Sequence, residues 1–299
     1  MRQKSSHLPV LLAEVLQGLS PQKGETVLDV TLGLGGHSAS FLHAIGEQGH
    51  LIGMDADAEN LEQAKTLLRD AAGEKTFYHC NFCEIPHMNL PLCDVVFADL
   101  GLSSPHLDTP SRGFSFRFQG PLDLRFDRTT GETAAELVEH SSEEQLRRLL
   151  RNYGEVQSAG ALSAYMVLQK PKTTTALKEC VEHVCGFRAK NVLPQVFQAL
   201  RMAVNDELGS LRTLLQEGPA LLQPGGRMGI ISFHSLEDRM VKLAFRALST
   251  PTINATTGAV TKKAPFVLLT KKGLVPTSQE IHANPRARSA RLRLLQKTF

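Results

Sequence analysis

The 299-residue sequence lacks any long hydrophobic run. No segment approaches the ~18 apolar residues that a membrane-spanning helix needs, so we expect no membrane partner. The apolar stretch at 8–16 is interrupted by Pro9 and Glu14, and no small-residue cleavage site of the signal-peptide type accompanies it. These absences predict a folded protein of the cytoplasm.

Cysteine is also scarce, with five residues in the whole chain. An odd number of cysteines does not suit a disulfide framework and indicates reduced thiols. Cys80 and Cys83 form a Cys-x-x-Cys pair, but no second Cys or His pair follows at zinc spacing, so we expect no metal. The Gly-x-Ser-x-Gly motif of many serine hydrolases is absent, which argues against that class of enzyme.

The composition that remains is ordinary for a globular protein, with 42% apolar and 21% charged residues, but the charge is unevenly distributed. Positions 262–299 hold nine Lys or Arg and one acid, Glu280, which is a net of +8. The other 261 residues sum to 24 minus 29, or −5. This asymmetry favours a polyanionic partner, because Lys and Arg neutralise phosphates. A solvated, charged strand face is the alternative.

Short apolar runs alternate with helical patterns from residue 26 onward, which is typical of a parallel sheet covered by helices. The alternation stops between 105 and 205, where helical patterns near 132–151 and 157–169 predict a mainly α-helical insertion. We therefore predict an α/β fold with a doubly wound seven-stranded sheet, formed by 1–104 and 206–299. The expected strands are 26–32, 50–55, 76–80, 94–100, 227–233, 265–270 and 290–297, and the other expected helices are 37–46, 57–72, 205–222 and one that Ser235 caps.

A glycine-rich loop follows the first expected strand, in the sequence Asp29-Val-Thr-Leu-Gly-Leu-Gly-Gly-His-Ser. Glycines at such a strand-to-helix turn let backbone N–H groups approach a ligand closely. The dinucleotide fingerprint Gly-x-Gly-x-x-Gly would require glycine at position 38, which is Ser38, so a nicotinamide dehydrogenase is disfavoured. An acidic residue in the strand before the glycines is instead typical of S-adenosylmethionine-dependent methyltransferases.

Two further carboxylates end expected strands. Asp55 closes the second strand, where it can accept hydrogen bonds from both ribose hydroxyls of an adenosine, or else cap the helix at 57–72. Phe82 follows the third strand, where its ring would cover an adenine or belong to the core. Asp99 ends the fourth strand, and ligands of such sheets bind beyond the carboxyl ends of the strands.

Long motifs extend this pattern through nearly the whole chain. They are HxPVLLxE at 7–14, GGHS at 35–38, DLGLSSPHLD at 99–108, RGFSF at 112–116, GPLDLRFD at 120–127, FQALRMAVNDEL at 197–208, GGRMGIISFHSLEDRMVK at 225–242 and NPRARSARLR at 284–293. In these motifs the chain resembles the bacterial ribosomal RNA small subunit methyltransferase H family, also called the MraW or RsmH type. That family methylates the N(4) amino nitrogen of a cytidine in 16S rRNA.

The resemblance implies a Rossmann-like methyltransferase sheet, the cofactor S-adenosyl-L-methionine, and 16S rRNA or the small ribosomal subunit as partner. Carried over by position, it implies that the cofactor is bound by Gly35, Gly36, His37, Asp55, Phe82, Asp99 and His106. The chain departs from the family at His106, where glutamine is usual, and at 191–196, where NVLPQV replaces HPATRT. The second departure lies in the insertion, which we expect to recognise the substrate.

We assign the catalytic role to Asp99, whose carboxylate would accept the amino hydrogens of the target base as positive charge develops on the nitrogen. Ser232 and His234 lie at the exit of the fifth strand and could bind the base edge, although His234 could equally be a structural histidine. Arg112 belongs to a loop in which Arg and Phe alternate, a composition that suits RNA contact or a packed loop. Among the C-terminal basic residues, we expect Arg286, Arg288 and Arg291 to contact the RNA backbone.

A second class of function stays open at this stage. The chain could be a non-catalytic RNA-binding or ribosome assembly factor on a methyltransferase fold, although Gly35, Gly36, Asp55 and Asp99 argue against loss of the cofactor site. The sequence leaves the oligomeric state open between a monomer and a homodimer.

Overall fold

The computed structural model describes residues 9–254 and 259–299. The chain forms two compact units, the sheet unit (Met1–Gly101 with Gly209–Phe299) and the helical unit (Leu102–Leu208). These boundaries lie three residues outside the expected ones at 105 and 205. Within the two described ranges, no helix is long and apolar enough to cross a bilayer.

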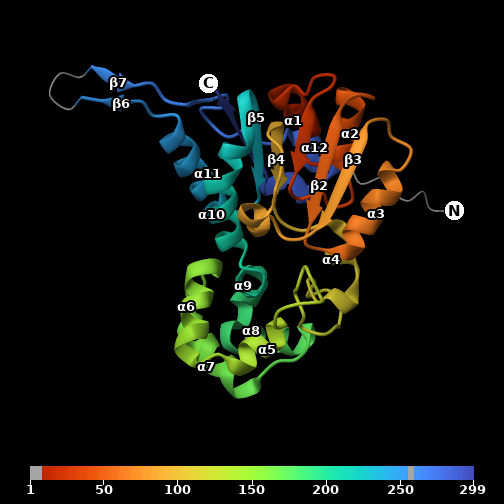
Figure 1. Cartoon of the computed structure of the whole chain (residues 1–299). Coiled ribbons are helices and arrows are strands. Elements are labelled where there is room, and N and C mark those ends of the chain that lie inside the picture. The colour runs from red at the N-terminus through yellow and green to blue at the C-terminus, as the bar shows by residue number, and fades with distance from the viewer. Residues whose placement is uncertain (1–8, 255–258) are drawn as a thin grey trace. The chain divides into compact units, whose positions relative to one another are not determined.

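The sheet unit contains a seven-stranded sheet, as predicted, and its strand order is β3-β2-β1-β4-β5-β9-β8 (Figure 1). The first five strands of the chain pair in parallel, and the last two pair antiparallel to their neighbours. The strands are β1 (Thr26–Asp29), β2 (His50–Asp55), β3 (Glu74–His79), β4 (Cys93–Asp99), β5 (Leu222–Ser232), β8 (Phe266–Leu268) and β9 (Arg291–Lys297).

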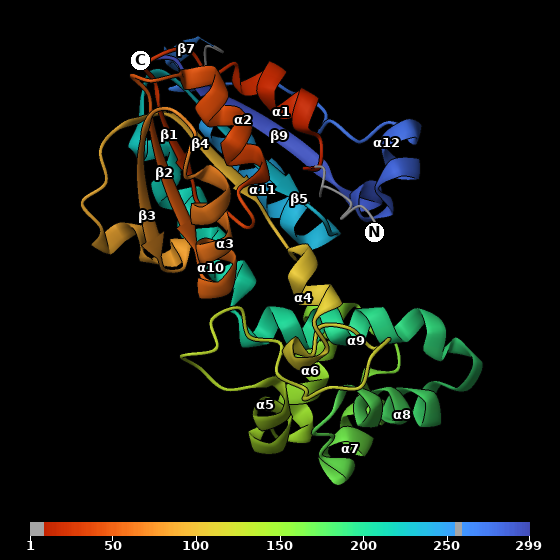
Figure 2. The same cartoon turned by 90° about the vertical axis from the view of Figure 1, so that its right-hand side faces the viewer.

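Helices cover both faces of this sheet, which explains why its strands read as continuous apolar runs. Val27 and Val95 pack on one face, with residues of α1, α2 and α3, whereas Leu28 and Val96 pack on the other, with residues of α10 and α11 (Figures 1 and 2). The helices are α1 (Leu12–Leu19), α2 (Gly36–Ile45), α3 (Ala58–Leu68), α10 (Glu207–Glu217), α11 (Ser235–Leu248) and α12 (Ser278–Ala283).

Several local expectations for the sheet unit were wrong. The strand expected at 227 begins at Leu222, and its pairing with β4 shifts register around the Pro-Gly-Gly segment. His234, not Ser235, caps α11, since its side chain accepts a hydrogen bond from the Glu237 N–H. Neither α1 nor a small hairpin of β6 (Thr252–Ile253) and β7 (Val260–Lys262) was anticipated.

The helical unit is mainly α-helical, as the sequence predicts, but the single helix expected over 132–151 is two helices. Ser142 ends the continuity, because its side chain and that of Gln145 form a capping box that starts a new helix. The helices of this unit are α4 (Ser104–Asp108), α5 (Ala134–His140), α6 (Glu143–Gly154), α7 (Ala159–Gln169), α8 (Thr174–Cys185) and α9 (Ala189–Val204), around an apolar core of their own.

Candidate functional site

Three neighbouring parallel strands of the sheet unit each end on an aspartate. Asp29 ends β1, Asp55 ends β2 and Asp99 ends β4. Because β1 pairs with both β2 and β4, the three carboxyl ends lie at the same edge of the sheet. Ligands of doubly wound sheets bind at this edge. The structure therefore brings together the acidic residues that the sequence singled out.

The surroundings of these three carboxyl groups disfavour the ionised form of each. Burial raises the pKa of Asp29 to about 6, of Asp55 to about 7 and of Asp99 to about 8. The pKa of Asp99 is raised further by the carboxylates of Asp29 and Glu237. Hydrogen bonds partly offset burial at Asp29 and Asp55, whereas Oδ1 of Asp99 has no hydrogen-bond partner in the described part of the chain. A cation bound beside these carboxyl groups would lower their pKa values and favour the ionised forms.

The glycine loop is tied directly to one of these carboxylates. The Gly33 N–H donates to Oδ2 of Asp55 at 2.6 Å, and Gly33 and Gly35 have φ angles of 53° and 82°, in the left-handed region that favours glycine. A Cβ on Gly36 would lie 2.8 Å from Cγ of Pro9. The loop therefore needs its glycines for its own conformation and packing, in addition to any approach of a ligand.

Asp55 holds this loop and does not cap the following helix. Its Oδ1 accepts the Asp57 N–H at 2.7 Å, and Asp57 is the residue whose side chain caps α3. The cap interpretation of Asp55 is therefore wrong. Each carboxylate oxygen can accept more than one hydrogen bond, so both oxygens of Asp55 retain acceptor capacity for a pair of ribose hydroxyls.

Asp99 is positioned by the side chain of Thr31, just after β1, and by a residue of α2. Its N–H donates to Oγ1 of Thr31 at 2.6 Å, and Nε2 of His37 lies 3.6 Å from Oδ2 of Asp99. His37 is buried, with its ring 4.8 Å from that of Phe97, while the Asp99 side chain is 25% exposed. Asp99 is thus partly accessible beside a buried histidine, as expected of a residue that contacts a ligand.

Phe82 begins a short 3-10 helix, η1 (Phe82–His87), which Asn81 caps. Its half-buried ring packs against the core of the sheet unit. A role in covering an adenine remains a prediction.

His106 lies on α4 of the helical unit and is buried. Its Nδ1 accepts the Ser103 N–H at 3.2 Å, and its ring packs 4.9 Å from that of Phe114 and 5.2 Å from that of Phe126. An imidazole fits this aromatic cluster, which gives the departure from glutamine a packing rationale. Its contact with a cofactor remains a prediction.

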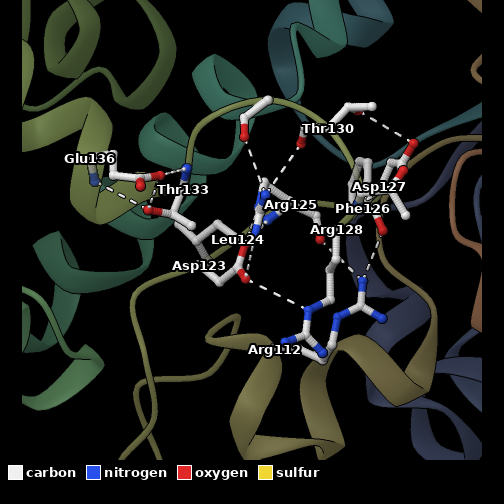
Figure 3. Close-up of polar contacts among 12 residues, drawn as sticks. Arg112, Asp123, Leu124, Arg125, Phe126, Asp127, Arg128, Thr130, Thr133 and Glu136 are labelled. Atoms are coloured by element: carbon white, nitrogen blue, oxygen red, sulfur yellow. Dashed lines mark hydrogen bonds and ion pairs between the residues drawn. The ribbon is translucent and has the colours of Figure 1, made fainter.

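Arg112 is enclosed by the loop to which it belongs (Figure 3). Its Nη2 donates to the backbone oxygens of Arg125 and Phe126 at 3.1 and 3.0 Å. Arg125 in turn holds Asp123 through two hydrogen bonds, of 2.7 and 3.1 Å. Of the two interpretations that the sequence left open, the geometry favours the packed loop for both arginines.

The same loop depends on Asn205, which sequence reasoning missed. Its Nδ2 donates to the oxygen of Leu124, and its Oδ1 accepts the Phe126 N–H, both at 2.8 Å. Leu124 is a buried non-glycine residue with φ 64°, a conformation that needs such support. The available signal was an asparagine at the C-terminal end of a helical pattern, which alone does not reveal a partner some eighty residues away.

The two residues expected at the base edge have local partners. Oγ of the buried Ser232 donates to the Arg291 oxygen at 3.4 Å. Nδ1 of His234 accepts the Glu237 N–H at 3.4 Å, and its Nε2 lies 3.0 Å from Oε1 of Glu237. This geometry favours a structural His234, the alternative that the sequence left open.

Of the C-terminal arginines, two lie exposed on a short helix and two lie beside Asp238. Arg286 and Arg288 are exposed on the short helix η5 (Pro285–Ser289). Arg293 forms two hydrogen bonds with Asp238, of 2.7 and 3.1 Å, and Arg291 lies 3.7 Å from the same carboxylate. Arg286 and Arg288 therefore remain candidates for RNA contact, whereas Arg293 joins β9 to α11.

Arg112→Ala should lower the free energy of unfolding by about 3 kcal/mol, because two partly buried carbonyls would lose a charged donor. Arg117→Ala is the matched control, since Arg117 is exposed in the same loop and its loss should cost no more than about 0.5 kcal/mol. Chemical denaturation of the full chain measures both values. Equal effects of the two substitutions would contradict a structural role for Arg112.

Comparison with known proteins agrees with this geometry. The family described as MraW methylase matches residues 4–298. A protein of Cyanothece sp. named Ribosomal RNA small subunit methyltransferase H is 42% identical over 294 residues, covering 97% of this chain and 94% of that protein. A protein of the same name from Syntrophotalea carbinolica is 41% identical over 312 residues and covers 99% of both chains. The chain therefore belongs to the MraW methylase family, a family of S-adenosylmethionine-dependent methyltransferases.

Proposed function

We propose that this protein transfers the methyl group of S-adenosylmethionine to the N(4) amino nitrogen of a cytidine in 16S rRNA of the small ribosomal subunit, in the cytoplasm. The observation that carries the proposal is the cluster of Asp29, Asp55 and Asp99 at adjacent strand ends. The names of the relatives support the small-subunit RNA as substrate. The motifs shared with the methyltransferase H family support the cytidine amino group.

The residues of the cluster fit the parts of the cofactor. The raised pKa values of the three carboxyl groups are what a site for a positively charged sulfonium ligand would show in its absence. Asp55 has acceptor capacity for the two ribose hydroxyls and also holds the glycine loop through Gly33. When bound, the cofactor supplies an electrophilic methyl group.

A cytosine amino nitrogen is a poor nucleophile, because its lone pair is delocalised into the ring, so alignment with the methyl group is the largest expected contribution. We assign to Asp99 the hydrogen bond from that amino group. During transfer the sulfur–carbon bond breaks, the nitrogen–carbon bond forms, and the nitrogen loses a proton. Once ionised, the Asp99 carboxylate can take up this proton, and burial, which raises its pKa to about 8, makes it a stronger base than an exposed aspartate.

Asp55→Asn should weaken S-adenosylmethionine binding by about 10- to 100-fold, which corresponds to the loss of one or two hydrogen bonds to a charged group. Asp57→Asn is the matched control, because it removes the same charge two residues away and asparagine caps a helix as well as aspartate does. Calorimetric titration gives both affinities. If the two variants bind the cofactor equally well, Asp55 is not a cofactor ligand.

Asp99→Asn should lower kcat by about 100-fold or more while the fold is retained, since an amide is isosteric but cannot take up the proton. The pH profile of kcat separates this role from simple positioning. The wild-type rate should rise with pH and level off at or below pH 8, because a bound cation lowers the pKa of Asp99, whereas the variant should show no such rise. Turnover within a factor of two of wild type would exclude Asp99 as a catalytic residue.

The competing function, a non-catalytic assembly factor, predicts a different outcome in cells. Mass mapping of modified nucleotides in 16S rRNA should show one N(4)-methylated cytidine that disappears when the gene is deleted and returns with the wild-type gene but not with Asp99→Asn. Unchanged methylation after deletion would instead support the assembly factor.

A further inference from the structure

A long segment of the sheet unit carries basic side chains and no acid. Between positions 239 and 279 there are seven Lys or Arg and no Asp or Glu. All seven are exposed. We call this set the basic strip, and it consists of Arg239, Lys242, Arg246, Lys262, Lys263, Lys271 and Lys272.

Three members of the basic strip share one side of α11. Arg239, Lys242 and Arg246 are spaced i, i+3 and i+7, which places them within about 60° around the helix and about 11 Å along its axis. The buried residues Val241 and Phe245, at other angles around the helix, attach it to the core. Three like charges at this spacing repel one another, so an anionic partner would stabilise the arrangement.

These cations also differ from the other arginines near α11. Arg291 and Arg293 share Asp238, whereas none of the three strip residues on α11 has an acidic side chain within 4.0 Å in the described part of the chain. Their positive charge is therefore available to a partner.

The β6–β7 hairpin continues the surface beyond the C-terminal end of α11, and its strands project away from the seven-stranded sheet in Figure 1. Ile253 and Val260 face each other across the hairpin and are 60% and 58% exposed. Lys262 and Lys263 adjoin them. Apolar side chains beside lysines suit a ribose or base with its flanking phosphates.

We infer that the basic strip is a second RNA-binding surface, which contacts the phosphate backbone of small-subunit RNA away from the target cytidine. This inference rests on the proposed function. α11 starts next to the end of β5, at the edge of the sheet that holds the candidate site, and its 14 residues extend about 21 Å toward the opposite edge. The hairpin follows at that far end, so it would contact a different part of a large RNA. A second copy of the chain is a poor occupant, because like charges would face each other.

The test compares two triple variants that remove the same charge. Arg239→Gln, Lys242→Gln and Arg246→Gln alter the strip. Lys23→Gln, Lys65→Gln and Arg69→Gln alter basic side chains outside it, before β1, on α3 and at the C-terminal end of α3. Binding to small subunits purified from cells that lack the gene is measured over a range of salt concentrations. The strip variant should reduce the slope of log affinity against log salt by about 2 to 3, at about 0.7 to 0.9 for each phosphate contact. The control should change the slope by less than 1.

Steady-state kinetics provides the second readout. The strip variant should raise KM for the subunit at least tenfold and leave kcat and the affinity for S-adenosylmethionine unchanged, because the strip would act only in RNA binding. Arg239→Lys with Arg246→Lys, which keeps the charges, should retain the wild-type salt slope. A melting temperature measured on each preparation corrects for any loss of folded protein.

A wild-type salt slope in the folded strip variant would overturn the inference. It would also be overturned if the substitutions abolished binding only to phosphatidylglycerol vesicles, or if they changed the oligomeric mass by light scattering, since those results would indicate a membrane surface or a contact between copies. Failure of the proposed function is distinguishable, because the wild-type protein itself would then methylate no subunit in the same assay.

Discussion

The burial of three carboxyl groups at the ends of adjacent parallel strands is the constraint on which the site depends. Between the ordinary pKa near 3.8 and the raised values, the folded protein binds more protons than the unfolded chain, so these groups lower stability as pH rises through that window. Hydrogen bonds from Ser38 to Asp29 and from Gly33 to Asp55 hold the carboxylates and the glycine loop together. A stability cost concentrated at one edge of a sheet is typical of a functional site.

The helical unit uses charge in a different way. Arg112 and Arg125 donate hydrogen bonds to backbone oxygens and to Asp123 (Figure 3). Asn205 donates to the oxygen of Leu124, and these contacts together hold the loop that includes this left-handed residue. Arginine within a family-like motif therefore need not contact RNA. In the sheet unit, exposed cations include those on α11, in the β6–β7 hairpin and on η5.

The sequence predicts those features of the fold and the site that depend on a local pattern of residues. Apolar runs ending in Asp29, Asp55 and Asp99 revealed the strands and the acidic edge, because both faces of a parallel sheet are buried. It could not reveal that Arg112 is enclosed, since the enclosing carbonyls come from residues more than ten positions away. The cap at His234 was missed because histidine rarely has that role, and the exposed β6–β7 hairpin has no buried face to produce a pattern.

The central claim is that this acidic edge binds a cationic methyl donor, and proton release on binding tests it most directly. Calorimetric titration at pH 7 in buffers of different ionisation enthalpy counts the protons released. S-adenosylmethionine should release protons from Asp55 and Asp99, and its affinity should rise between about pH 6 and 8, because a sulfonium charge lowers the raised pKa values. S-adenosylhomocysteine, whose sulfur is neutral, should release fewer. Release of no protons by S-adenosylmethionine, or equal release by the two ligands, would contradict the account.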